Sequence, residues 1–225
     1  GMPMPLNKAA AITRGLVRRV CTTLVASSAP VATISAAAGT RDLGAIRLGE
    51  TQDSTESGHV IMNGGTWNLG GTEGDPKAVI GFSTVLSSFI MNGGTIFFDG
   101  PASHPGSKGD DGLNGLDWEV GEKGLGRFEM HNNAVFRAGD DIKVGANTLG
   151  SGSVLIDGNA VVSVGSGISV SEGGPSSEQV MIVGGNALID SGNSMGAGNP
   201  EGSTDEGYLT MASGGSTGNL VVQDN

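Results

Sequence analysis

The sequence has little of what most enzymes and disulfide-bonded domains depend on. Its 225 residues include one cysteine, three histidines and nine aromatic side chains. Because Cys21 is alone, it cannot form an intrachain disulfide or a thiolate-rich metal site. His59, His104 and His131 lie too far apart in the chain for the short motifs of zinc sites. So few aromatic residues also argue against a wide core filled with aromatic rings.

Glycine, in contrast, is abundant, with 41 residues, and valine, isoleucine, leucine and methionine recur between the glycines. Glycine adopts positive φ without strain and allows close approach of two backbones, so this composition indicates many sharp turns. A disordered linker does not fit, because the apolar residues recur at regular intervals.

Charge is divided unevenly along the chain. Residues 1–41 contain five basic residues and no acidic residue, whereas the other 184 residues contain 7 basic and 23 acidic side chains. The body therefore carries a formal charge of −16, which repels phosphate backbones and argues against a nucleic-acid partner. Cationic partners, such as Ca²⁺ or a basic protein segment, fit this charge better.

One sequence motif recurs along residues 42–225 of the chain. The stretch VLIDGNAVVSVG, residues 154–165, has relatives that begin at Val60, Phe89, Phe128 and Met181. The apolar residue just before the turn recurs every 26 to 39 residues, which is typical of stacked repeat units. Because these residues occupy the same position in successive units, we expect them to stack in one column: Met62, Met91, Met130, Ile156, Val183 and Met211.

The apolar residues of each unit alternate with period 2, as in strands with one buried face. Each unit also contains a third short strand that ends in glycine, at residues 46–49, 78–81, 118–121 and 142–145. Three strands in about 26 residues predict one coil of a parallel β-solenoid, with about six coils in residues 42–225. The fold class is therefore all-β.

Equivalent residues of successive coils should stack at the ~4.8 Å spacing of strands. Besides the methionine column, a second internal ladder is predicted from Phe97, Phe136, Val162 and Ile189. The asparagines near the turns are expected to adopt left-handed conformations or to form amide ladders. These residues are Asn132, Asn133, Asn159 and Asn186.

The repeats, best seen in GSGSVLIDGNAVVSVG at residues 150–165, resemble the glycine-rich right-handed β-helices of bacterial secreted and autotransporter-type adhesin proteins. The resemblance extends over residues 45 to 225. It implies a single-stranded right-handed parallel β-helix, a secreted or cell-surface location, and a structural or adhesive role.

Residues 1–41 form a separate segment with two interpretations that do not exclude each other. Arg14, Arg18 and Arg19 precede an uncharged stretch over residues 20–40, which is the layout of a secretory signal. The same segment also has apolar residues at helical spacing, which predict a helix that begins near Asn7 and ends before Pro30. Such a helix would cap the solenoid or dock on another subunit. The apolar residues at this spacing form one stripe along the predicted helix and are Ile12, Leu16, Val20 and Leu24. No integral membrane span is expected, because the uncharged stretch is rich in serine, threonine and alanine.

Candidate chemistry centres on the stretch RAGDDIKVG, residues 137–145. Asp140 and Asp141 resemble the paired aspartates of polygalacturonase-like enzymes, in which one carboxyl group is the acid and the other activates water. Arg137 and Lys143 flank them and could neutralise an acidic sugar. The Gly-His-Gly segment and the Arg-x-Lys pair of those enzymes are missing from the sequence, so these four residues are candidates for binding rather than catalysis.

The insertion at residues 99–117 is the main candidate for binding a cation. It contains Asp110, Asp111 and Asp117, and clustered carboxylates are ligands that Ca²⁺ prefers. An ordinary solvated loop is the alternative, and no other cofactor is indicated.

The sequence thus predicts a non-catalytic extracellular solenoid with a structural or adhesive role. Self-association, either as an oligomer or head to tail into fibres, is expected, because solenoid ends are open to stacking unless they are covered. The alternative is a polysaccharide lyase, hydrolase or carbohydrate-binding β-helix with a cell-surface ligand.

Overall fold

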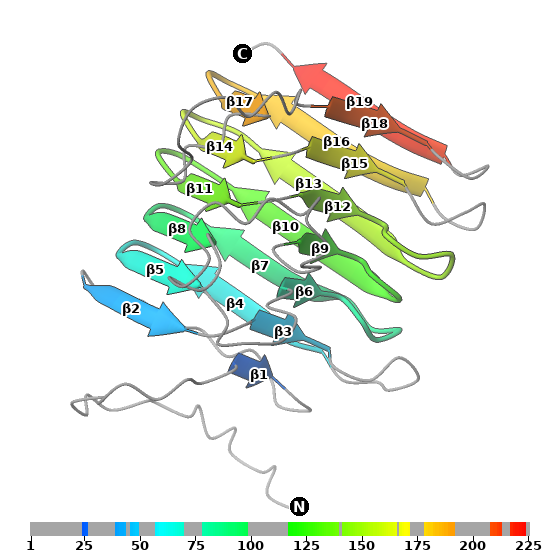
Figure 1. The fold of residues 1–225 in the computed structure, drawn as a ribbon, viewed down its shortest axis with the longest axis horizontal. Helices are drawn as coiled ribbons and strands as arrows, with labels where there is room; N and C mark the ends of the chain where they lie inside the picture. The colour runs from blue at the N-terminus through cyan, green and yellow to red at the C-terminus, as the bar shows by residue number, and fades with distance from the viewer. Residues whose placement is uncertain are drawn as a thin grey trace, which may run out of the picture.

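A computed structural model describes the following residues of the chain: 24–26, 39–43, 46–49, 57–69, 78–98, 117–139, 141–165, 167–171, 178–191, 208–212 and 217–223. All the secondary structure in these ranges is β-strand, and successive strands fall in turn into three parallel sheets (Figure 1). The protein is a parallel β-solenoid of about six coils, as the repeats predict. The right-handed sense implied by the resemblance stays a prediction.

We name the three sheets A, B and C, and each full coil contributes one strand to sheet C, then one to sheet B, then one to sheet A. Sheet A contains β1 (Leu24–Ala26), β3 (Ile46–Leu48), β6 (Ala78–Ile80), β9 (Trp118–Val120), β12 (Ile142–Val144), β15 (Gly167–Val170) and β18 (Tyr208–Met211). Sheet B contains β2 (Thr40–Leu43), β5 (Thr66–Leu69), β8 (Thr95–Phe98), β11 (Val135–Ala138), β14 (Val161–Val164) and β17 (Leu188–Ser191). Sheet C contains β4 (His59–Met62), β7 (Ser87–Met91), β10 (Leu125–Met130), β13 (Ser151–Ile156), β16 (Glu178–Gly184) and β19 (Thr217–Gln223).

The predicted methionine column is confirmed over five coils. Met62, Met91 and Met130 are register partners on sheet C, and the column continues through Ile156 to Val183. The three methionines are fully buried. Residues about one coil apart in sequence therefore stack inside the solenoid.

The sixth member of that column was predicted wrongly. Met211 lies in β18 of sheet A, where it pairs with Val170. The residue that stacks on Val183 is Val222 of β19. The long excursion after β17 delays the return of the chain to sheet C, and β18 occupies the third-strand position that precedes that return.

The second predicted ladder is wrong at one residue. Phe136 pairs with Ile96, and Phe97 pairs with Arg137. Ile96 is fully buried, whereas Phe97 is half-buried on the outer face of sheet B. The remaining pairs, Phe136 with Val162 and Val162 with Ile189, are as predicted.

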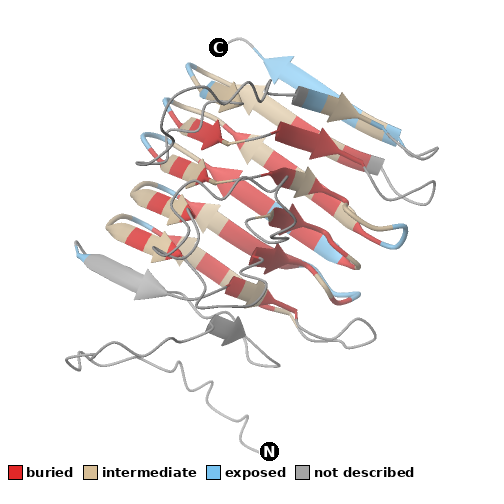
Figure 2. Cartoon of the chain, viewed as in Figure 1, coloured by how far each residue is buried: buried red, intermediate tan, exposed pale blue. Residues whose placement is uncertain are grey.

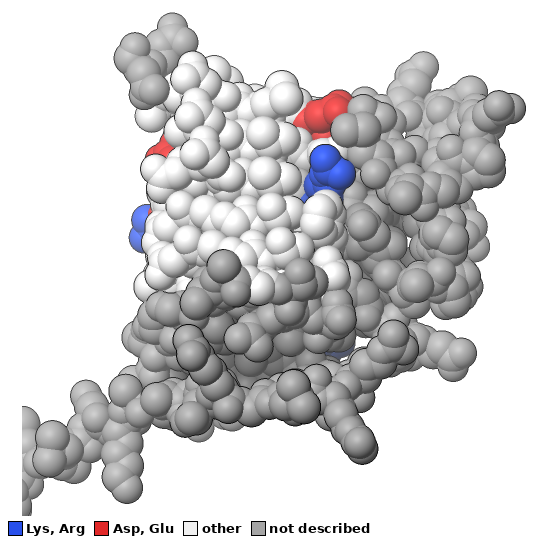
Figure 3. Space-filling view, turned by 90° about the vertical axis from the view of Figure 1, so that its left-hand side faces the viewer, with Lys and Arg blue, Asp and Glu red and all other residues white. Residues whose placement is uncertain are grey.

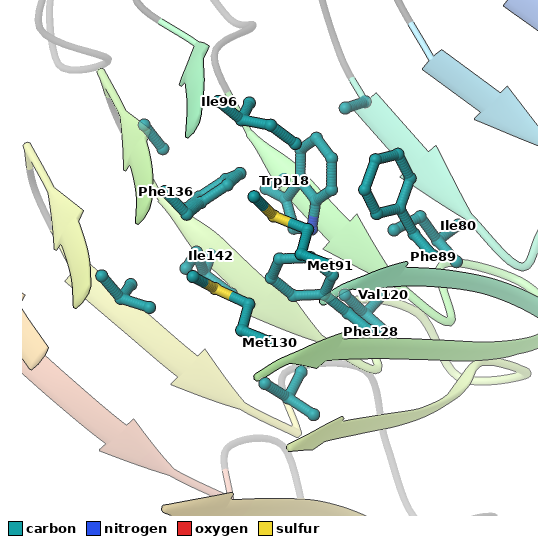
Figure 4. Close-up of a cluster of buried hydrophobic side chains, with 14 of the residues drawn as sticks. Ile80, Phe89, Met91, Ile96, Trp118, Val120, Phe128, Met130, Phe136 and Ile142 are labelled. Atoms are coloured by element: carbon teal, nitrogen blue, oxygen red, sulfur yellow. The ribbon is translucent and has the colours of Figure 1, made fainter. Parts of the chain in front are cut away.

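The core lies between the three sheets, where burial is concentrated (Figure 2). Its centre is more aromatic than the composition suggested. Trp118 packs against Phe136 with ring centroids 4.8 Å apart and against Phe128 at 5.2 Å (Figure 4). Ala78, one coil earlier in the same column of sheet A, leaves room for the large indole. Six of the aromatic side chains are fully buried: Trp67, Phe89, Phe98, Trp118, Phe128 and Phe136.

The corner between sheets A and C has left-handed backbone after each of the strands β3, β6, β9, β12, β15 and β18. Gly81 and Gly121 have φ of +87° and +72°, conformations that favour glycine. The position is also crowded, because a Cβ on Gly121 would overlap the backbone carbonyl of Ser151. The glycine that ends each third strand in the sequence is explained by these two constraints. In the later coils Ser171 and Ala212 adopt the same conformation.

The opposite corner, between sheets C and B, carries the predicted asparagines. Asn132 has φ of +59°. The amide of Asn186 donates to the Oδ1 atom of Asn159 at 3.1 Å, and the amide of Asn159 donates to the Oδ1 atom of Asn133 at 3.2 Å. In the first coils, Asn92 donates to Asn63 at 2.8 Å. Both predicted roles, left-handed turn and amide ladder, are therefore present.

The predicted N-terminal helix falls largely outside the described residues. Its last stripe position, Leu24, is wrong, because Leu24 lies in β1 and pairs with Ile46 of β3. Ile12, Leu16 and Val20 lie outside the described residues.

Candidate functional site

Three of the residues predicted from sequence lie together at one edge of sheet A, where its strands begin. Asp117 precedes β9 and Asp141 precedes β12, and because Trp118 pairs with Ile142, the two aspartates occupy equivalent positions in successive coils. Lys143, on the outer face of β12, places its Nζ atom 2.7 Å from Asp117 Oδ2 and 3.8 Å from Asp141 Oδ2. We call Asp117, Asp141 and Lys143 the sheet A ion cluster.

This ion cluster is held firmly between coils. The other oxygen of Asp141, Oδ1, accepts a hydrogen bond from the backbone N–H of Gly167 at 2.8 Å. The side chains of Asp117, Asp141 and Lys143 are 15%, 10% and 22% exposed. Two like charges stacked at the spacing of strands repel each other, and the lysine between them offsets that repulsion. The geometry thus gives the cluster a role in joining coils.

The neighbouring outer positions of sheet A are buried rather than open. Val79 and Glu119 are each 4% exposed, and Ser169 is 1% exposed. Glu119 is the register partner of Lys143. A ligand that approached Lys143 along this face would therefore have little accessible surface at the described positions.

In the described part of the chain, no other predicted site residue joins this cluster. Asp140, Asp110 and Asp111 lie outside the described residues. Arg137 lies on the outer face of sheet B, where its guanidinium carbon is 5.6 Å from the ring centroid of Phe97. It is a cation–π partner of that ring, one coil away, and is not part of the sheet A ion cluster.

Within the described part of the chain, no group of three or more histidine, cysteine, aspartate or glutamate side chains has a geometry that could hold a metal ion. The Ca²⁺ prediction depends mainly on Asp110 and Asp111, outside that part. Its third residue, Asp117, already directs one oxygen at Lys143.

A second cluster, on sheet C, was not predicted from the sequence. His131 Nδ1 is 2.8 Å from Asp157 Oδ1, and His131 Nε2 is 3.3 Å from Glu129 Oε2. Arg127 makes an ion pair with the other oxygen of Glu129. We call these four residues the sheet C ion cluster.

The signal for this cluster was present in the repeat. Asp157 follows His131 by 26 residues, which is one coil, so the two side chains had to stack. Glu129 precedes His131 by two residues. A search for zinc spacings within one segment could not find this arrangement, because its partners come from different coils.

The carboxylates control the charge of His131. Partial burial alone lowers the pKa of His131, but the hydrogen bonds and negative charges of Asp157 and Glu129 outweigh that effect and raise the pKa above its ordinary value. The imidazole therefore stays protonated to a higher pH than a free histidine does.

Beyond His131 and Asp157 of the sheet C ion cluster, the described turns at the corner between sheets C and B carry no charged side chain. Figure 3 views the molecule from the side of these turns and shows uncharged surface over the described residues, with a few charged side chains at its margins. Side-chain amides lie along this corner and bond to one another, with Asn92 donating to Asn63, Asn159 to Asn133 and Asn186 to Asn159.

Fold and clusters together define the class of this protein as a parallel β-solenoid. Comparison with family models, with characterised proteins and with solved structures gave no match for the chain. None of the described segments forms a helix with the length and apolar character needed to cross a bilayer.

Proposed function

We propose that this chain is a non-catalytic extracellular β-solenoid with a structural or adhesive role, and that it associates end to end with further copies of itself. The observation that carries the proposal is the exposure of the last described coil. Val222 is 73% exposed, although its column partners Met62, Met91 and Met130 are fully buried. Leu209 and Leu220, on the inward side of β18 and β19, are 50% and 38% exposed.

An apolar cross-section of this kind favours stacking. In the described part of the chain, β17, β18 and β19 are the outermost strands of their sheets. A further strand can add to such an edge at the ~4.8 Å spacing and cover the apolar residues below it. Contacts of this head-to-tail type produce filaments when they do not close into rings.

The ion pairs and hydrogen bonds of Asp117 and Asp141 support a non-catalytic role. Asp117 and Asp141 are directed at Lys143, and Asp141 is also bonded to the backbone of Gly167. A general acid or base must instead be free to exchange a proton with a substrate. The extracellular location rests on the resemblance of the repeats and on the signal-like layout of residues 14–40.

The experiment is a measurement of mass across a concentration series, combined with electron micrographs of the same samples. We expect the mass to rise with concentration and the micrographs to contain rods longer than one molecule. Val222→Asp places a charge on the exposed end and should suppress this growth. A wild-type protein that stays monomeric at high concentration, with and without Ca²⁺, would remove the end-to-end part of the proposal.

A carbohydrate-active solenoid is the second candidate, because the sheet A ion cluster places two carboxylates beside a lysine. Release of reducing ends from a panel of acidic polysaccharides tests it. Activity that is lost in Asp141→Asn would favour the enzyme over the structural role. Absence of release across the panel counts against it.

A further inference from the structure

The outer face of sheet C carries aliphatic side chains that the core does not need. Inward positions of the first strands of this sheet are fully buried, as at Val60, Phe89 and Phe128, so the residues between them point outward. We define the sheet C face as two outward columns and two bordering leucines. The first column is Ile61, Ile90, Glu129, Leu155, Ile182 and Val221. The second column is His59, Ser88, Arg127, Ser153, Val180 and Asn219. The bordering residues are Leu86, directly before β7, and Leu125, at the start of β10.

The aliphatic residues of this face remain accessible to different degrees. Leu86, Leu125 and Val221 are 41%, 42% and 38% exposed. The isoleucines of the first column and Leu155 are half-buried, as expected where side chains stack on the coil above and below. Clustered apolar surface of this kind on a soluble fold indicates an interaction site.

The charge of the sheet C face differs from that of the body. Of aspartate, glutamate, lysine and arginine residues, the two outward columns contain Arg127 and Glu129, which pair with each other. Glu129 is 6% exposed, and its second oxygen faces His131. These two columns therefore add no formal net charge, and Glu178 and Asp157 lie beside them, whereas residues 42–225 have a formal charge of −16.

This difference identifies the occupant. Two copies of a strongly acidic body repel each other over most of their surfaces, and they can approach closely only across a neutral face. A cationic partner would gain no net electrostatic attraction from the two columns of this face. A sugar would find no aromatic ring there on which to stack. A second copy of the chain presents the same aliphatic column, Ile61, Ile90, Leu155 and Ile182, and can cover it without bringing two acidic surfaces together.

The size of the face sets the strength of the contact. Six strands at ~4.8 Å spacing, each with about five to six residues at ~3.3 Å, give about 500–600 Å² per copy. The total of about 1,000–1,200 Å² is at the lower end for specific interfaces. The contact should therefore be weak and depend on concentration.

We propose that the sheet C faces of two copies pack against each other, so that solenoids associate side by side through Ile61, Ile90, Leu155 and Ile182. Sheets packed in this way lie about 10 Å apart with nearly aligned strands. The inference rests on the self-associating role proposed above and adds a lateral contact to the end-to-end contact. Together the two contacts would convert single filaments into paired ones.

The test compares variants of the full chain by sedimentation equilibrium over a wide concentration series. Ile90→Glu and Ile182→Glu place an uncompensated charge in the face, and each should raise the dissociation constant of the lateral dimer at least about tenfold. Val135→Glu is the matched control, because Val135 is also a half-buried outward residue, on sheet B. The control should associate like the wild type, and melting temperatures should show that all three variants are folded.

The outcomes separate the two contacts. If Ile90→Glu and Ile182→Glu associate like the wild type while Val222→Asp does not, the lateral contact is overturned and the end-to-end contact stands. If Val222→Asp has no effect and the isoleucine variants stay monomeric, the lateral contact stands alone. A wild-type protein that is monomeric at every concentration overturns both.

Discussion

A methyl group added at the corner between sheets A and C should break the stacking of coils. In Gly121→Ala, the alanine must adopt φ near +72°, which costs about 1–2 kcal/mol for a residue with a side chain. Its Cβ would also overlap the backbone carbonyl of Ser151 in the next coil, and a backbone cannot move aside as a flexible side chain can. Overpacking of this kind costs about 1–3 kcal/mol, so the total loss is about 2–5 kcal/mol.

Gly184→Ala is the matched control. Gly184 does not have a positive φ, and a Cβ there would lie 3.8 Å from the nearest atom, the carbonyl oxygen of Gln223. Alanine should therefore be neutral at this position, or stabilising by a few tenths of a kcal/mol to about 1 kcal/mol.

The assay is urea unfolding followed by tryptophan fluorescence, because both Trp67 and Trp118 are buried. Thermal scans should show a melting temperature lowered by about 4–20 °C for Gly121→Ala, using about 2–4 °C per kcal/mol for a chain of this size. Equal midpoints for Gly121→Ala and Gly184→Ala would refute the account of this corner.

Two further predictions concern side chains that join coils. In Gln179→Ala the buried amide is lost, and the N–H of Gly152 and the carbonyl of Gly150 lose their partner, so the free energy of unfolding should fall by about 2–5 kcal/mol in urea titrations. A loss below about 1 kcal/mol would mean that water replaces the amide. For His131, the raised pKa of the folded state means that its contribution to stability is complete below the unfolded pKa of about 6.5 and is lost as pH rises through the folded pKa. The urea midpoint of the wild type should therefore exceed that of His131→Gln at pH 5 by more than at pH 8, and a difference independent of pH would contradict this.

Much of the fold could be predicted because one signal repeats. The motif at the turn marks the same position in successive coils. In a parallel solenoid, residues one coil apart must stack. The ladder from Met62 to Val183 and the glycines at the ends of the third strands follow from this rule.

The rule fails where coils differ in length. Three residues lie between β7 and β8, whereas four lie between β10 and β11. Equal spacing would align Phe97 with Phe136, but the shorter turn aligns Ile96 instead. Residues 96–98 are Ile-Phe-Phe, and three consecutive apolar residues give no alternation that could correct the register. The wrong prediction for Met211 has the same origin. The excursion after β17 changes the number of residues in that coil, so equal spacing no longer identifies the residue that stacks on Val183.

The candidate site was only partly predictable. Asp141 and Lys143 are neighbours in sequence, but the position of Asp117 beside Lys143 depends on the coil below. His131 and Asp157 are 26 residues apart, so the short spacings of known zinc motifs do not connect them. A search at the coil period of 26 residues would have paired them.

The central claim is that equivalent residues of neighbouring coils are direct neighbours in space. Thr95 and Val135 are outward register partners on sheet B, and Val161 is the partner of Val135 in the next coil. In a Cys21→Ser background, Thr95→Cys combined with Val135→Cys should form an intramolecular disulfide, because the two Cα atoms would lie about 4.8 Å apart, within the range that a disulfide spans. Cysteines at 95 and 161 should not, because two strand spacings, about 10 Å, exceed that range. Mass spectrometry of the monomer detects the disulfide in each of the two double variants. A bridge between 95 and 135 with none between 95 and 161 is the predicted result, and the reverse, or no bridge in either protein, would contradict the solenoid.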